Sequence, residues 1–288
     1  MNNFVIFTDS SCDLSREMLA ELNIVSLPLT FRFNGEDVEY SDGDMPSSTF
    51  YAKMRNGETA KTSAVNNQAF KDEFSRLLAS GMDILYIGFS SGLSTTYNSA
   101  RIAAGEAVSE YPDRKIRLVD SLCASAGLGL LLKLTAEMRD NGVSLDEAAD
   151  FAESIKMSIC HWFTVDDLVY LKRGGRVSPT VAFVGNILGI KPVMHVDNDG
   201  HLINCTKVRG RRSAITALAD KYTELAKTPE SGYVYISHGD CYKDAAMLAD
   251  MIKERHGNSV DVITDVGLVI GAHSGPGTLA LFFVGKER

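Results

Sequence analysis

The sequence is poor in cysteine, and its cysteines follow no pairing pattern. There are five in 288 residues, and no two of them lie within four residues of each other. Disulfide frameworks and zinc sites both need regularly or closely spaced cysteines. We therefore expect small buried side chains in a reducing compartment at Cys12, Cys123, Cys160, Cys205 and Cys241.

Long apolar runs and an excess of positive charge are also absent. No run approaches the roughly 18 apolar residues of a membrane span, and the first residues lack the basic and apolar regions of a signal peptide. The formal charge is 29 minus 37, or −8, which argues against bulk electrostatic binding to nucleic acids or anionic membranes. We expect a cytoplasmic protein that binds no nucleic acid and does not insert stably into membranes.

Nucleotide-binding and metal-binding motifs are missing as well. No segment fits G-x-x-x-x-G-K-[ST] or G-x-G-x-x-G, and Gly127-Leu128-Gly129 is followed by leucines, so packing explains these glycines. The six histidines show no ligand spacing, and we identify no acidic cluster beside them. They are His161, His195, His201, His238, His256 and His273. We expect no metal ion and no cofactor.

Strand and helix signals alternate in the first half of the sequence. Residues 4–8, 84–89 and 116–119 form short apolar runs typical of buried strands, and helical patterns lie between and after them. This alternation predicts a doubly wound parallel sheet. The second half changes character near Lys156, where hairpin and helix signals predict an α+β domain with a mainly antiparallel sheet. The fold class is therefore α/β with two domains, residues 1–157 and 158–288.

Small polar residues gather in four loops, three of which directly follow a predicted strand. Ligands of open parallel sheets bind beyond the carboxyl ends of the strands, so we expect these loops to converge there. The loops span residues 8–11, 61–63, 90–96 and 120–121. Hydroxyl groups and backbone N–H groups at a helix N-terminus suit a carboxylate or phosphate. The alternative is that these residues serve only as helix caps and turn formers.

One catalytic motif does match this sequence. Residues 88–92 fit G-x-S-x-G after a strand, with Ser90 as the nucleophile, and Asp265 and His273 follow in the order of an α/β-hydrolase triad. Against a serine hydrolase, the loop runs several residues past Ser90 before a helix is expected. No oxyanion segment precedes it, and the sheet before Ser90 is short for that fold.

Two further segments are candidates for function. His273 lies among three glycines and Pro276 within residues 271–277, and such a rigid turn favours presentation of the imidazole to a ligand. Between Lys172 and Arg212, eight Lys or Arg residues stand against two Asp, a local charge of +6. Such a stretch is either a solvated face or a docking surface for an acidic partner or ATP phosphates.

Taken together, these motifs resemble the DegV family of fatty-acid-binding proteins over nearly the whole chain. The matching segments are Asp9-Ser10-x-x-Asp13-Leu14, Lys61-Thr62-Ser63, residues 90–100, Val119-Asp120-Ser121, Leu171–Ser178, Gly189–Pro192, Lys207-x-Arg209-Gly210 and His273-x-Gly275-Pro276-Gly277. Two positions depart from the family pattern. Ala64-Val65 replaces Gln-Pro, and Thr95 replaces a glycine, both beside the expected carboxylate site.

The resemblance implies two α/β domains that bury one long-chain fatty acid. By the same resemblance, Thr62 and Ser94 hold the carboxylate with His273 nearby, and we include the neighbours Ser63 and Thr95 in this site. It further implies a non-catalytic, substrate-binding subunit of a fatty acid kinase. A separate ATP-binding kinase subunit would phosphorylate the bound carboxylate for phospholipid synthesis, and a lipid-sensing module without a kinase is the alternative.

The basic segment then has a candidate partner. A kinase subunit must bring ATP to the carboxylate, and phosphoryl transfer gathers negative charge. We predict that this subunit docks on Arg173, Arg176, Lys207 and Arg209, which lie in glycine-flanked motifs.

Overall fold

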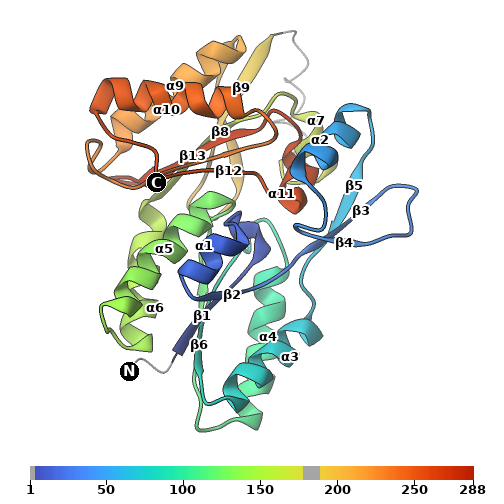
Figure 1. Cartoon of the computed structure of the whole chain (residues 1–288), viewed down its shortest axis with the longest axis vertical. Helices are drawn as coiled ribbons and strands as arrows, with labels where there is room; N and C mark the ends of the chain where they lie inside the picture. The colour runs from blue at the N-terminus through green and yellow to red at the C-terminus, as the bar shows by residue number, and fades with distance from the viewer. Residues whose placement is uncertain (1–3, 178–188) are drawn as a thin grey trace.

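A four-stranded parallel sheet forms the base of the N-terminal half in this computed structural model, which describes residues 4–177 and 189–288 (Figure 1). The strand order is β2-β1-β6-β7, and every neighbouring pair is parallel. The strands are β1 (Phe4–Asp9), β2 (Ile24–Leu27), β6 (Asp83–Gly88) and β7 (Ile116–Asp120). The predicted parallel sheet is confirmed.

Helices cover both faces of this sheet because its buried side chains alternate between two hydrophobic clusters. Phe7 and Tyr86 pack with the helices on one face, whereas Ile6 and Leu85 pack with those on the other. The first face carries α3 (Asn67–Ala79) and α4 (Thr96–Glu110), and the second carries α5 (Ala126–Asp140) and α6 (Leu145–Ile155). A short helix, α1 (Arg16–Glu21), precedes β2.

A small antiparallel sheet, which we did not predict as a separate unit, extends from this half. Its order is β4-β3-β5 (Figure 1). It consists of β3 (Thr30–Phe33), β4 (Tyr40–Ser41) and β5 (Ala60–Ser63), and α2 (Ser47–Arg55) lies between β4 and β5 in the sequence. Phe31 and Phe33 of β3 pack against Phe50 of α2, so this unit has its own aromatic contacts.

The C-terminal half is built on a six-stranded sheet of order β10-β9-β8-β13-β11-β12. Neighbours are antiparallel except β11 and β12, so the predicted, mainly antiparallel sheet is confirmed. The strands are β8 (Ile159–Thr164), β9 (Ile190–Val196), β10 (Leu202–Arg209), β11 (Val234–His238), β12 (Val262–Asp265) and β13 (Leu279–Val284). The helices of this half are α7 (Val169–Arg173), α9 (Arg211–Leu225), α10 (Tyr242–His256) and α11 (Leu268–Ser274).

Helix α5 joins the two large sheets. It follows β7 of the parallel sheet, yet it also contacts β8, β11 and β13, and one hydrophobic cluster includes residues of both sheets (Figure 1). The chain passes from one sheet to the other at η2 (Lys156–Ser158), where we predicted a boundary after residue 157. The two predicted domains therefore share part of their core through α5.

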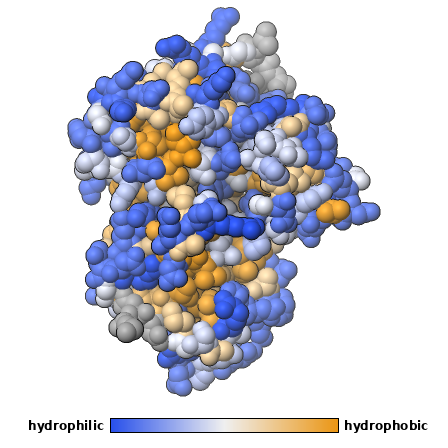
Figure 2. Space-filling model, viewed as in Figure 1, coloured by the Kyte–Doolittle hydropathy of each residue, from blue (hydrophilic) through white to orange (hydrophobic). Residues whose placement is uncertain are grey.

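The visible surface is largely hydrophilic (Figure 2). On the face seen in Figure 2, hydrophilic residues form most of the outline, and most hydrophobic residues that show lie inside it. Among residues 4–177 and 189–288, no helix is both long enough and apolar enough to cross a membrane.

Glycine 127 lets α5 approach the antiparallel sheet. A Cβ at this position would lie 2.2 Å from Nε2 of His161, whereas a Cβ at Gly105 of α4 would meet nothing within 4 Å. Gly127→Ala should therefore lower the free energy of unfolding by about 1–3 kcal/mol through overpacking. Gly105→Ala should raise it by roughly 0.5–1 kcal/mol through helix propensity. Thermal unfolding of both variants tests these opposite effects, and two changes of the same sign would contradict them.

Candidate functional site

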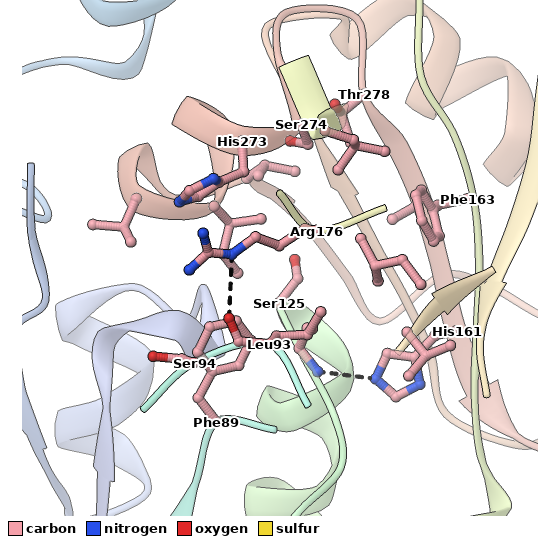
Figure 3. Close-up of a pocket in the computed structure, with 18 of the residues that line it drawn as sticks. Phe89, Leu93, Ser94, Ser125, His161, Phe163, Arg176, His273, Ser274 and Thr278 are labelled. Carbon is pink, nitrogen blue, oxygen red and sulfur yellow. Dashed lines mark hydrogen bonds between the residues drawn. The ribbon is translucent and has the colours of Figure 1, made fainter. Parts of the chain in front are cut away.

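A cavity of about 460 Å3 lies between the loops of the N-terminal half and the face of the antiparallel sheet that α5 contacts (Figure 3). Its wall combines the loop after β6, the strand β5, the helix α11 and the strands β8 and β13. Most of the lining is apolar, including Phe89, Leu93, Phe163, Leu171, Val266, Val269, Ile270, Ala280 and Phe282. Size and lining are those of a pocket for a small organic ligand with a few orienting polar groups.

Two of the four predicted polar loops reach this cavity. Ser94 lies in its wall, where its Oγ accepts a hydrogen bond from Thr96 N at 3.2 Å at the start of α4. Thr62 of β5 lines it too. The other two loops have structural roles: the buried Asp9 carboxylate accepts a hydrogen bond from Phe89 N, and Ser121 Oγ donates to the Gly88 carbonyl oxygen.

Thr62 and His273 meet at the polar end of the cavity. Thr62 Oγ1 and His273 Nε2 are 2.8 Å apart and share a hydrogen bond, although 211 positions separate them in the sequence. Positive φ at Gly275 and Gly277 shapes the turn that ends α11, as the glycine pattern predicted. Burial, together with the nearby charge of Arg176, lowers the pKa of His273 to about 4, so the imidazole is neutral at pH 7.

Arg176 supplies a positive charge at the same end. Its guanidinium lies between His273 and Ser94 in the view of Figure 3. Nε donates to the Leu93 carbonyl oxygen at 3.2 Å, and Nη1 donates to the Gly174 carbonyl oxygen. Burial lowers the pKa of Arg176 from its ordinary value, but a guanidinium stays charged at pH 7. In the described part of the chain no carboxylate forms an ion pair with it.

The predicted site residues are therefore only partly brought together. Thr62, Ser94, Thr95 and His273 line the cavity, whereas Ser63 does not, because successive strand residues face opposite sides; its hydroxyl donates to Glu39 at 3.2 Å. Arg176, which we assigned to partner docking because it lies in a basic, glycine-flanked motif, lines the cavity.

The remaining basic residues of the predicted docking segment stay outside the cavity. Arg173 and Arg209 are exposed and Lys207 is half-buried. Two other cations of the segment are already paired, since Lys191 and Arg211 both lie within ion-pair distance of Asp166. The predicted Ser178 lies outside the described residues.

The geometry gives no support to a triad on Ser90. This side chain is fully buried, and its Oγ donates to the Gly200 carbonyl oxygen at 2.9 Å. His273 pairs with Thr62, and Asp265 accepts a hydrogen bond from Ser47 at 2.5 Å. The three members of the proposed triad are thus engaged with other partners.

One acidic cluster beside a histidine escaped the sequence analysis. Asp197, Asp199 and His201 place one potential ligand atom each within 4.8 Å of the others. Asp197 Oδ1 accepts hydrogen bonds from the backbone N–H groups of Asp199 and His201, so the carboxylate shapes the β9–β10 turn.

Comparisons with known proteins agree with this architecture. A family model described as the DegV family matches residues 3–286. A DegV domain-containing protein of Clostridium perfringens is 42% identical over 289 residues, which cover 100% of this chain and 99% of the relative. Two solved structures are similar to this chain. A DegV lipid-binding protein of Thermotoga maritima has 30% sequence identity and a TM-score of 0.85, with 100% of each chain covered. A stearic-acid-binding protein of Eubacterium ventriosum has 25% sequence identity and a TM-score of 0.88, with 98% of each chain covered.

Proposed function

Because this chain belongs to the DegV family, we propose that it binds one long-chain fatty acid in the cavity and presents the carboxylate to a separate kinase subunit. The observation that carries the proposal is the half-buried guanidinium of Arg176, which faces an apolar cavity without a carboxylate partner among the described residues. A fatty acid carries the missing negative charge on an apolar chain. Thr62, Ser94 and the neutral His273 surround the same point and offer hydrogen bonds to a carboxylate.

The apolar wall supplies the binding free energy in this proposal. Burial of about 15 methylene groups at ~0.8 kcal/mol each offers on the order of 12 kcal/mol before entropic costs. A ligand held this way should survive purification. The solved relatives named above as lipid-binding and stearic-acid-binding support the same ligand class.

Mass spectrometry of the purified full-length chain tests the first part. We expect about one equivalent of a long-chain fatty acid after extraction, and exchange with added oleate or palmitate. An empty protein that takes up neither acid would refute fatty acid binding. Binding without acyl-phosphate formation by any kinase subunit would instead favour the lipid-sensing module.

In this proposal, the present chain binds the fatty acid and a separate kinase subunit binds ATP. The sequence has no recognisable nucleotide-binding loop, so in this proposal the ATP comes with a cytoplasmic partner, and the acyl phosphate enters phospholipid synthesis. The exposed Arg173 and Arg209, with Lys207, are the proposed docking cations. Charge complementarity acts mainly on encounter and specificity, so these residues should affect turnover more than lipid binding.

We expect Arg173→Ala and Arg209→Ala each to reduce kinase-dependent acyl-phosphate formation several-fold while bound lipid stays constant. Turnover by the parent should also fall as salt rises, because exposed charges are screened. Both quantities are measured on the same preparations. Lys253→Ala, which removes an exposed lysine of α10, is the matched control. Full turnover in both variants, or lost lipid in both, would contradict the assignment.

A further inference from the structure

Besides Thr62 and Ser94, four further hydroxyl groups interrupt the apolar wall of the cavity. Ser125, Ser237, Ser274 and Thr278 line it, and each side chain is at most 6% exposed. They come from the start of α5, from β11, from the end of α11 and from the residue before β13. In Figure 3, Ser274 and Thr278 lie in the upper part of the view, and Ser125 lies below them near its centre. An acyl chain made only of methylene groups offers these hydroxyl groups no hydrogen-bond partner.

Among these four residues, it is Ser274 whose hydroxyl group lacks a hydrogen-bond partner in the described part of the chain. Its Oγ is buried and has no hydrogen-bond partner among residues 4–177 and 189–288. Thr278, close by in the sequence, has already committed its hydrogen, since Oγ1 donates to the Gly275 carbonyl oxygen at 2.7 Å. An unpartnered buried hydroxyl costs free energy that a bound polar group recovers.

Ser237 also keeps unused capacity. Its Oγ is 2.9 Å from that of Ser125, which in turn is hydrogen-bonded to the buried carboxyl group of Asp13. A hydroxyl has one hydrogen and two lone pairs. Because Ser125 donates its only hydrogen to Asp13, Ser237 donates to Ser125, and the lone pairs of Ser237 remain free to accept a hydrogen bond.

The backbone holds Ser125 in place at some cost. Its φ of 54° and ψ of −150° lie outside the regions that non-glycine residues ordinarily adopt. Residues held in such conformations cluster at ligand-binding sites, where the surrounding structure fixes them. The hydroxyl pair of Ser125 and Ser237 is thus a fixed polar patch in an otherwise apolar wall.

We infer that the acyl chain bound here carries a hydroxyl group part way along its length. A hydroxyl both donates and accepts, so it can engage the unpartnered Ser274 Oγ or the free lone pairs of Ser237. Sites built to hydrogen-bond a substrate hydroxyl discriminate against the analogue that lacks it. This inference rests on the proposed fatty acid binding and narrows its ligand class to hydroxy fatty acids.

Competition binding with lipid-free, full-length protein tests the inference. Stearate is compared with octadecanoic acids that carry one hydroxyl at every second carbon between the carboxylate and the methyl end. At least one isomer should bind about tenfold more tightly than stearate. The substitution that removes the partner of this hydroxyl, Ser274→Ala or Ser237→Ala, should bring the ratio of the two dissociation constants close to one. Ser63→Ala, on the far side of β5, should leave that ratio as in the parent.

Three outcomes separate the possibilities. If stearate binds and no hydroxylated isomer binds more tightly, the hydroxy-acid inference is overturned while fatty acid binding stands. If Ser274→Ala and Ser237→Ala each weaken stearate and the preferred isomer equally, neither serine bonds a hydroxyl of the acyl chain and the inference is again overturned. If neither stearate nor any isomer binds, the proposed function itself fails.

Discussion

Replacement of Thr62 by valine together with Ser94 by alanine should weaken fatty acid binding about a hundredfold or more. Both hydroxyls line the polar end of the cavity, one from β5 and one from the loop after β6. A hydrogen bond to a charged group contributes ~1.5–3 kcal/mol, and about 1.4 kcal/mol is a factor of ten in affinity. Loss of two such bonds should therefore weaken binding more than the replacement of any single exposed residue.

The measurement is a titration of lipid-free parent and double variant with the same fatty acid. Valine keeps the shape of threonine and suits a strand, so β5 should remain intact. Ser63→Ala is the matched control, because it removes a neighbouring hydroxyl that faces Glu39 instead of the cavity. Equal affinities of parent and double variant would place the carboxylate elsewhere, and Thr95, the departure nearest the site, would be examined next.

Much of the framework was readable in the sequence because burial leaves a simple pattern. The apolar run at 84–89 became β6, whose last five residues are buried, since a parallel strand covered on both faces needs no polar side. The rule that ligands bind beyond the carboxyl ends of parallel strands pointed to the loop that carries Ser94, and the family resemblance pointed to Ser94 itself. The small sheet was not predicted, because its strands have four residues or fewer and β4 only two.

The sequence could not show which residues far apart in the chain lie together in the folded protein. Arg176 belongs to a basic stretch, and the sum of its charges does not tell which side chain turns inward. The guanidinium is fixed by carbonyl groups of Leu93 and Gly174, and the first of these lies 83 positions away. The orientation of Ser63, by contrast, could be read from the sequence, because strand alternation implies that it and Thr62 face opposite sides.

Arg176→Gln should lower the affinity for a long-chain fatty acid by about 10- to 100-fold. His273 is neutral at pH 7 because burial lowers its pKa to about 4, so in the proposed complex Arg176 is the cation that faces the carboxylate. Glutamine keeps a hydrogen-bond donor but removes the charge, which is the part of the interaction worth most in a half-buried site. Octadecanol, which has no charge, should lose far less affinity than stearate.

The same substitution should stabilise the lipid-free protein, although it weakens fatty acid binding. Without ligand, the parent holds a half-buried guanidinium that has no carboxylate partner among the described residues, and removal of an uncompensated charge is stabilising. Arg176→Gln should therefore raise the Tm of the lipid-free protein while it shrinks the increase in Tm that stearate causes. Arg173→Gln, an exposed neighbour, should change neither value. If Arg176→Gln weakened stearate and octadecanol equally, its side chain would act by packing, and the anionic head group would lie away from this guanidinium.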